Sequence, residues 1–522
     1  MTDELLNERY ALAIERIRQI PAEKSVPQPY RDFFAQMAQY LCKMDQIRSR
    51  IAEGYLKTAS EEELAVFNRE PYEDVIGEWY ETSYGNPAFA VRALGETHGR
   101  SLCCLYRELG NAVVWVYEDR LLELTAAMEL YLELYAMFEE KTLPSAQYVK
   151  ESIYWYVSDY AEERQEYQVR EIVDPSLHFV KDIVMESDLT DLRYLYQYGE
   201  YITENEKGTA RFLNKFSQEE IDAMARTYTE GFRKCFLVAR KDLSKKKTVS
   251  IRFHIGFERM IRAAIRQFEE MGLEVILYRA AVWSVTMSPN RKIGYHGTSA
   301  NMQFDYDHRY DQAIYLDKAF KERKLAVLRT AYENCKKQAA EYAGPAVVET
   351  FGEDGFEPLN KPEAYSLSEK QEELQIAYSN EAMPVVNQYI PGDETSFTII
   401  AFPVPAIGRD FAEIFHETIR INTLDYEEYK KIQQNLVDVL DQAEYVTVTG
   451  NAAAGNETQM KIFLHTLTDP EKQTNFENCV ADVNIPLGEV FTSPVLTGTN
   501  GVLEVSSVYI GDIQFKNLHM EF

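Results

Sequence analysis

Basic residues are scarce in this chain of 522 residues. Its 55 lysines and arginines stand against 84 aspartates and glutamates, so the formal net charge is −29 at pH 7. A surface this acidic repels the phosphate backbone of nucleic acids. The lysine triplet Lys245–Lys247 is too short to form a basic stripe and is interpreted as a solvated linker. We therefore expect no nucleic-acid partner.

Long hydrophobic runs are also missing. The first 21 residues are charged throughout and lack the apolar core of a signal peptide. No stretch reaches the roughly 18 uncharged apolar residues that a membrane span requires. The six cysteines include no C-x-x-C pair, and the adjacent Cys103 and Cys104 are not spaced for zinc. These absences predict a cytoplasmic protein with reduced thiols and no membrane partner.

Proline and glycine are sparse in residues 1–243, which have a helical pattern. Asp119–Glu140 is rich in Leu, Ala, Met and Glu, and its apolar residues recur at spacings of three and four. Similar patterns occur near residues 33–52, 146–158 and 218–239. We predict a helical domain over 1–243 that supplies a packing or interaction surface, because nothing in it has catalytic spacing.

The pattern changes at residue 244. Thr248–Ile255 alternates and is β-branched, which predicts a strand, and an apolar stripe over Phe257–Met271 predicts a helix. Gly272 lies where a helix C-cap is expected, and Leu273–Arg279 reads as a second strand. Together these segments predict a β-α-β unit with parallel strands and a right-handed crossover.

The remainder of this α/β domain, residues 244–443, is predicted from coarser signals. A long helix is expected from about Gln312 to Tyr342, ended by Gly344–Pro345. Further strands are predicted at 346–351 and 397–405, a helix at 426–440, and loops over the Pro-rich stretch 352–391.

Short alternating segments separated by Gly, Asn and Asp-Pro begin at residue 444 and predict a β-rich domain over 444–522. Its last segment stops in mid-pattern on the apolar Phe522. Since an unpaired apolar strand at a terminus favours aggregation, we expect this domain to be incomplete and the chain to be a fragment. The expected fold class is a multidomain α/β protein with helical, α/β and β-rich parts.

Three short motifs contain residue types found in functional sites. Asp305–Asp311 (DYDHRYD) offers metal-compatible ligands, but its position before a long helix favours helix capping. His416–Glu417 lacks the second histidine of a zinc-binding helix. Gly450–Thr458 lacks the Lys-Ser/Thr of a phosphate-binding loop and is interpreted as a turn between strands.

The most specific motif is Asn484–Pro494 (NIPLGEVFTSP), followed by Asn500–Val505 (NGVLEV). This segment resembles the signature of the thermophilic-type metallo-aminopeptidases, a family that includes leucyl aminopeptidases. Ala401–Ala406 (AFPVPA) and the β-α-β unit are similar to parts of the same family. The likeness covers residues 244–522, and residues 1–243 resemble the helical extension of longer members.

The resemblance implies a metal-dependent aminopeptidase that acts on peptides and forms a homodimer. Two divalent metal ions (zinc, cobalt or manganese) would activate water, and Glu489 matches the first glutamate ligand. Residues 444–522 would then be an incomplete metallopeptidase domain. The other ligands are expected beyond Phe522, so the chain alone should be inactive or nearly so. Five histidines match none of the family's ligands: His254, His296, His308, His416 and His465.

Catalytic and substrate-binding residues are not identified by the sequence. The alternative interpretation is a non-catalytic binding or scaffolding protein with a relic peptidase domain. In that case Glu489 is an ordinary glutamate on a surface loop.

Overall fold

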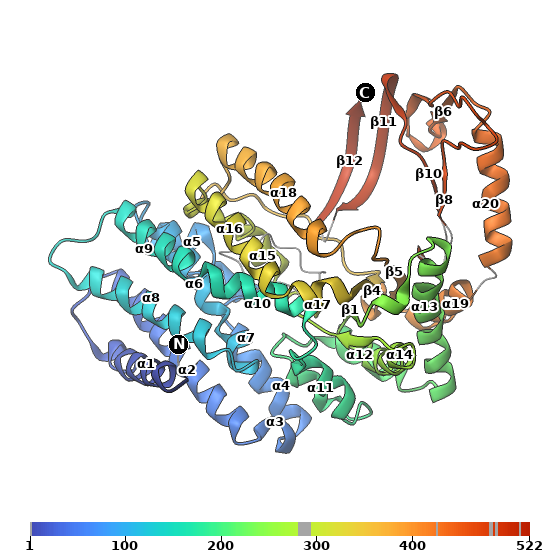
Figure 1. Cartoon of the computed structure of the whole chain (residues 1–522). Helices are drawn as coiled ribbons and strands as arrows, with labels where there is room; N and C mark the ends of the chain where they lie inside the picture. Colours follow the sequence, from blue (N-terminus) through green and yellow to red (C-terminus); the bar gives the residue numbers. More distant parts are fainter. Residues whose placement is uncertain (1–2, 280–293, 424–425, 480–483, 486–488, 511–512) are drawn as a thin grey trace.

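The computed structural model describes residues 3–279, 294–423, 426–479, 484–485, 489–510 and 513–522. These residues form a mixed α/β protein with one parallel sheet and further antiparallel strands. Figure 1 shows the helical first part in blue to cyan, the parallel sheet near the centre, and a long red hairpin ending at the C-terminus. The α/β class predicted from the sequence is therefore confirmed.

Thirteen α-helices are described before residue 243, and the four predicted there are confirmed to within three residues at each end. Short polar caps begin several of them; Ser217 and Glu220, for example, form a capping box at the start of α13. The helices are α1 (Asp3–Ile17), α2 (Tyr30–Ala52), α3 (Tyr55–Thr58), α4 (Glu61–Arg69), α5 (Pro87–Leu94), α6 (Gly99–Gly110), α7 (Ala112–Tyr117), α8 (Leu121–Glu139), α9 (Ala146–Asp159), α10 (Ala161–Val173), α11 (Phe179–Glu186), α12 (Glu204–Leu213) and α13 (Gln218–Val238).

The parallel sheet has the strand order β2-β1-β4-β5-β9, with β3 paired to β1 on the β2 side. The predicted β-α-β unit is confirmed, because α14 (Glu258–Glu270) connects β1 to its parallel neighbour β2. Gly272 has a φ of +81°, as expected for the residue that ends such a helix. The strands are β1 (Thr248–His254), β2 (Glu274–Ile276), β3 (Tyr295–His296), β4 (Tyr342–Phe351), β5 (Thr398–Pro403) and β9 (Asn484–Ile485).

Two large hydrophobic cores hold the first four-fifths of the chain together. The first joins α1, α2 and α6–α9 through buried aromatic rings such as Phe34 and Tyr131. The second packs α11–α13 and α14 against the parallel sheet, with Phe232 and Ile251 fully buried. This second core contains residues on both sides of position 243. The limits 1–243, 244–443 and 444–522 stay predictions.

The predicted helix from Gln312 to Tyr342 is wrong in its ends. The structure has α16 (Lys318–Asn334) and α17 (Lys336–Glu341), and β4 starts directly afterwards at Tyr342. Gly344 therefore lies inside a strand. A Cβ atom there would be 1.8 Å from the Ser396 carbonyl oxygen, so the close approach of the neighbouring chain requires glycine.

The loops predicted over 352–391 are also wrong in part, because α18 (Glu369–Tyr389) occupies half of this stretch. The helix contains Pro384 and buries little of its own surface. Ser368 and Gln371 form a capping box at its start, and Val385 lies in one hydrophobic cluster with Leu328 and Tyr332 of α16.

The C-terminal part is β-rich, as predicted. An antiparallel sheet has the order β12-β11-β7-β6, and β8 and β10 form a separate two-stranded ribbon. The strands of the sheet are β6 (Tyr445–Thr449), β7 (Gln459–Phe463), β11 (Val495–Ile510) and β12 (Ile513–Glu521), and those of the ribbon are β8 (Glu477–Cys479) and β10 (Glu489–Phe491). The remaining helices are α15 (Met302–Asp307), α19 (Phe411–Asn422) and α20 (Tyr426–Leu440). In the described residues, no helix is both long enough and apolar enough to cross a bilayer.

Candidate functional site

The signature segment Asn484–Pro494 runs from one sheet to another. Asn484 and Ile485 form β9 and pair in parallel with Ile399 and Ile400 of β5, at the edge of the central sheet. Residues 486–488 lie outside the described residues. Glu489 then begins β10, which pairs antiparallel with β8. Glu489 is therefore the first described residue after β9 and begins the two-stranded ribbon.

The side chain of Glu489 lies on the solvent face of the β8–β10 ribbon. Val490, the next residue, packs on a small core formed by Val437 of α20, Leu464 and Phe476. Because successive side chains in a strand point to opposite faces, Glu489 and Phe491 point away from this core, and both are exposed.

A second carboxylate lies on the same face of the ribbon. Glu477 is the direct cross-strand partner of Phe491, so it is diagonal to Glu489. Diagonal neighbours are about 7–8 Å apart, and their Cβ atoms are somewhat closer. An open hollow of about 520 Å³ lies beside the ribbon; its lining includes Glu477, Phe491 and His465.

The described residues do not form a complete two-metal centre. No group of three or more His, Cys, Asp or Glu side chains in that part of the chain is placed to hold a metal ion. The metal-binding role of Glu489 stays a prediction from the resemblance. The five histidines considered above are spread over the fold: His254 ends β1, His296 ends β3, His308 follows α15, His416 packs on Phe212 and Phe216, and His465 follows β7.

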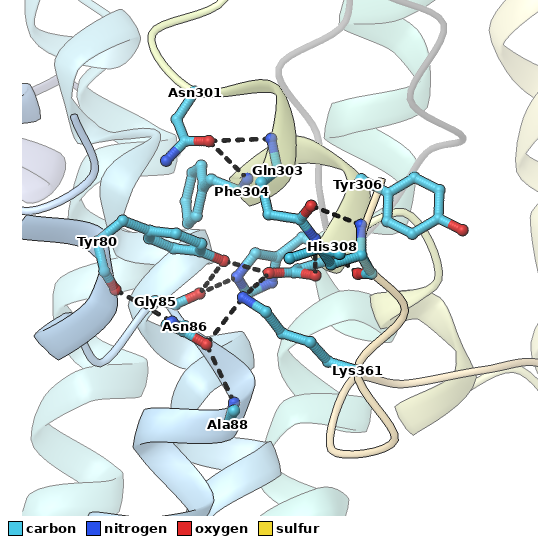
Figure 2. A network of polar contacts seen from close by, with 12 residues as sticks. Tyr80, Gly85, Asn86, Ala88, Asn301, Gln303, Phe304, Tyr306, His308 and Lys361 are labelled. Carbon is cyan, nitrogen blue, oxygen red and sulfur yellow. Dashed lines mark hydrogen bonds and ion pairs between the residues drawn. The ribbon is translucent and has the colours of Figure 1, made fainter. Parts of the chain in front are cut away.

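Three residues of the acidic motif Asp305–Asp311 are buried in a polar cluster: Asp307, His308 and Asp311. Figure 2 shows His308 of this cluster with Tyr80 and Lys361. Asp307 is 1% exposed and accepts hydrogen bonds from the hydroxyl of Tyr80 at 2.5 Å, from Lys361 Nζ at 2.7 Å and from Gln303 Nε2 at 2.8 Å. Burial, together with the charge of Asp307, raises the pKa of Tyr80, so the phenol stays protonated and donates.

The capping function predicted for this motif is therefore wrong for its buried residues. The long helix α16 starts later than expected, and it is Asp317 that caps it by accepting a hydrogen bond from the Phe320 amide at 2.7 Å. Asp307 and Asp311 instead hold side chains that come from distant parts of the sequence.

His308 carries a positive charge in this cluster. Its Nδ1 is 2.7 Å from an Asp311 carboxylate oxygen, and its Nε2 is 2.8 Å from the Gly85 carbonyl oxygen. Both partners are acceptors, so both ring nitrogens must be protonated. Burial lowers the pKa of His308, but the Asp311 carboxylate and Cys103 together outweigh burial, so the pKa is raised well above its ordinary value.

The cluster is balanced in charge and holds the fold together. Two carboxylates, Asp307 and Asp311, face two cations, His308 and Lys361. A doubly protonated imidazole has no lone pair for a metal ion. The contacts tie the turn at Gly85 to the end of α15 and to the loop at residue 361, so we assign the cluster a structural role.

The charge on His308 makes stability depend on pH. The pKa of His308 is higher in the folded than in the unfolded protein, so its charge contributes fully to the free energy of unfolding below the unfolded pKa of about 6.5. This contribution is lost as the pH rises through the folded pKa. We expect the stability difference between the wild type and His308→Gln to shrink by up to about 1.4 kcal/mol per pH unit above pH 6.5. Urea unfolding at pH 6, 7, 8 and 9 measures this difference.

His178→Gln is the matched control for that series. His178 also pairs with an aspartate, Asp182, but its side chain is 58% exposed. Its substitution should have a small effect at every pH. A stability difference for His308→Gln that stays constant from pH 6 to pH 9 would contradict the charged state assigned to this ring.

The sequence analysis missed a group of polar residues at the carboxyl edge of the parallel sheet. His254 and His296 are the last residues of β1 and β3, and their rings meet edge to face at 5.3 Å. A signal was present, since each histidine ends an apolar or aromatic segment just before a glycine-containing turn.

Comparison of the chain with protein families, curated proteins and solved structures gives no match.

Proposed function

We propose that this chain is part of a cytoplasmic, metal-dependent aminopeptidase that releases N-terminal residues from peptides. The observation that carries the proposal is the eleven-residue segment Asn484–Pro494, with Glu489 in the position of a metal ligand. In the complete enzyme two divalent ions, zinc, cobalt or manganese, would serve as cofactors. The proposal includes a homodimer.

The position of Glu489 supports this function. Glu489 is an exposed residue of a ribbon whose other face packs on α20, so the backbone around it is held in place. A carboxylate held in this way is a suitable ligand for zinc or a harder divalent ion. The order of a parallel α/β sheet followed by an antiparallel β-rich part also agrees with the proposal.

The described residues supply one proposed ligand, whereas a two-metal centre needs several. The proposal therefore expects little or no activity from the 522-residue chain by itself, and full activity from the protein purified from its native source.

The test compares these two samples in an assay that follows release of a fluorescent group from aminoacyl amides. We expect the native protein to release the group, to lose activity with a metal chelator and to regain it when zinc, cobalt or manganese is added. N-acetylated substrates should not react, because an aminopeptidase requires a free amino terminus. No release by the native protein with any of these metals would favour the binding or scaffolding alternative.

A further inference from the structure

An apolar stripe runs along the exposed side of α20. Ile432, Leu436 and Val439 are each at least 50% exposed, and the partly exposed Tyr429 extends the stripe by one turn towards the start of the helix. These four residues follow one another at spacings of three, four and three, so they lie on one face of the helix. The same spacing forms the seam between paired helices in coiled coils.

This stripe is distinct from the face by which α20 packs on the β8–β10 ribbon. Val437 is buried in the small core with Leu464 and Phe476, and Leu440 packs against the same core. A helix of a soluble protein needs one apolar face for its own packing. An additional exposed apolar stripe indicates an interaction with another molecule. Figure 1 shows α20 along the outer edge of the C-terminal part of the chain.

The order of residues along α20 fits a second copy of the same helix. When two such helices pack antiparallel about a twofold axis near residue 434, Ile432 of each copy faces Leu436 of the other. In the outer layers, Tyr429 of each copy faces Val439 of the other. Every residue of the stripe then has an apolar partner, and an interface with this twofold symmetry closes as a dimer.

The polar residues beside the stripe agree with this arrangement. Glu428, Asn435 and Gln442 follow one flank of the stripe at intervals of seven residues. Antiparallel pairing places the Asn435 side chains of the two copies together and places Glu428 beside Gln442, so amide groups meet an amide or a carboxylate and can form hydrogen bonds. Parallel pairing would instead bring the two Glu428 carboxylates together, which is unfavourable.

The charge of α20 allows two acidic molecules to meet at this helix. The net charge of −29 on the whole chain opposes self-association. Within Tyr426–Leu440, however, two lysines nearly balance three acidic residues. The helix is also fixed to the ribbon before a partner binds, which lowers the entropic cost of association.

We propose that the exposed stripe of α20 is a self-association surface, at which two copies of this chain pair through antiparallel α20 helices. One helix from each copy makes a small contact, so the dimer is weak, with a dissociation constant on the order of 10 μM. A homodimer is part of the function proposed above, but this surface is inferred from the residues of α20 alone and does not rest on peptidase activity.

Sedimentation equilibrium of the 522-residue chain, from about 1 to about 200 μM, tests the proposal. We expect the average mass to rise with concentration from 60.4 kDa towards twice that value. Ile432→Lys and Leu436→Glu, each tested alone, should weaken the dimer at least about tenfold, because each places a charge against an apolar residue in both layers of the seam. A wild type that stays at 60.4 kDa up to the highest concentration would overturn the proposal.

An equal mixture of these two variants tests the antiparallel arrangement. In a mixed dimer, the introduced lysine of one copy faces the introduced glutamate of the other, and the unchanged Leu436 faces the unchanged Ile432 in the second layer. The mixture should therefore associate at least about tenfold more tightly than either variant alone. A mixture that associates no better than the separate variants would contradict antiparallel pairing and overturn the proposal.

Ile376→Lys is the matched control, because Ile376 is also more than half exposed but lies on α18. Its substitution should leave the association unchanged, and all three variants should unfold at the same urea concentration as the wild type. An equal loss of association with Ile376→Lys would place the contact away from α20 and overturn the assignment. The readout is mass, not activity, so failure of the peptidase proposal leaves this result unaffected.

Discussion

Replacing Asp307 by alanine is expected to lower the free energy of unfolding by about 3–5 kcal/mol, because removing one partner leaves buried charge without compensation. Asp307 is 1% exposed, and Lys361, which pairs with it at 2.7 Å, is 15% exposed. The hydroxyl of Tyr80 would lose its acceptor at the same time. Urea unfolding at pH 7 measures the change.

A double-mutant cycle separates this ion pair from simple loss of packing. Lys361→Met alone should also lower the free energy of unfolding. The double variant with Asp307→Ala should lose less stability than the sum of the two single losses, because no unpaired cation remains. Asp393→Ala, at an exposed turn, is the control and should change stability by less than about 0.5 kcal/mol. Strict additivity, or a loss below about 1 kcal/mol for Asp307→Ala, would contradict the cluster's structural role.

Glu489→Gln in the native protein is expected to reduce kcat by at least about a hundredfold, if the proposed function holds. An amide keeps the size of the side chain but removes the charge that a metal ligand needs. Even the substitution of a residue that only orients a metal ligand typically lowers metal affinity or activity about 10–100-fold. Steady-state kinetics with a good aminoacyl amide substrate measures the effect.

Glu477→Gln provides the matched control for this substitution. Glu477 lies on the same face of the β8–β10 ribbon and is also exposed, but the resemblance assigns it no role. Its variant should keep most of the activity and fold equally well. Equal kcat values for Glu489→Gln and the wild type would remove Glu489 from the proposed machinery.

Local patterns predicted the elements whose causes are local. The apolar stripe of α14 and Gly272 behind it were sufficient for the β-α-β unit, because helix periodicity and a left-handed C-cap are encoded within about 15 residues. The turn between β6 and β7 was recognised in the same way, from its glycine and asparagine residues.

Other features depend on partners far away in the sequence. Asp307 could not be assigned from its neighbours, since its partners Tyr80 and Lys361 are 227 and 54 residues distant. The two-residue strand β9 joins the parallel sheet by pairing with β5, which lies more than 80 residues earlier in the sequence. The group of polar residues at the carboxyl edge of the sheet could be recognised only from the strand order, because the pairing of β1 with β3 places His254 beside His296.

The content of bound metal in the native protein tests the aminopeptidase proposal most directly. Elemental analysis of the wild type and of Glu489→Gln, after removal of loosely bound ions, gives the number of zinc, cobalt and manganese ions per chain. The proposal predicts two ions in the wild type and fewer than two in the variant. A wild type without these metals, or a Glu489→Gln variant that keeps both ions, would contradict it.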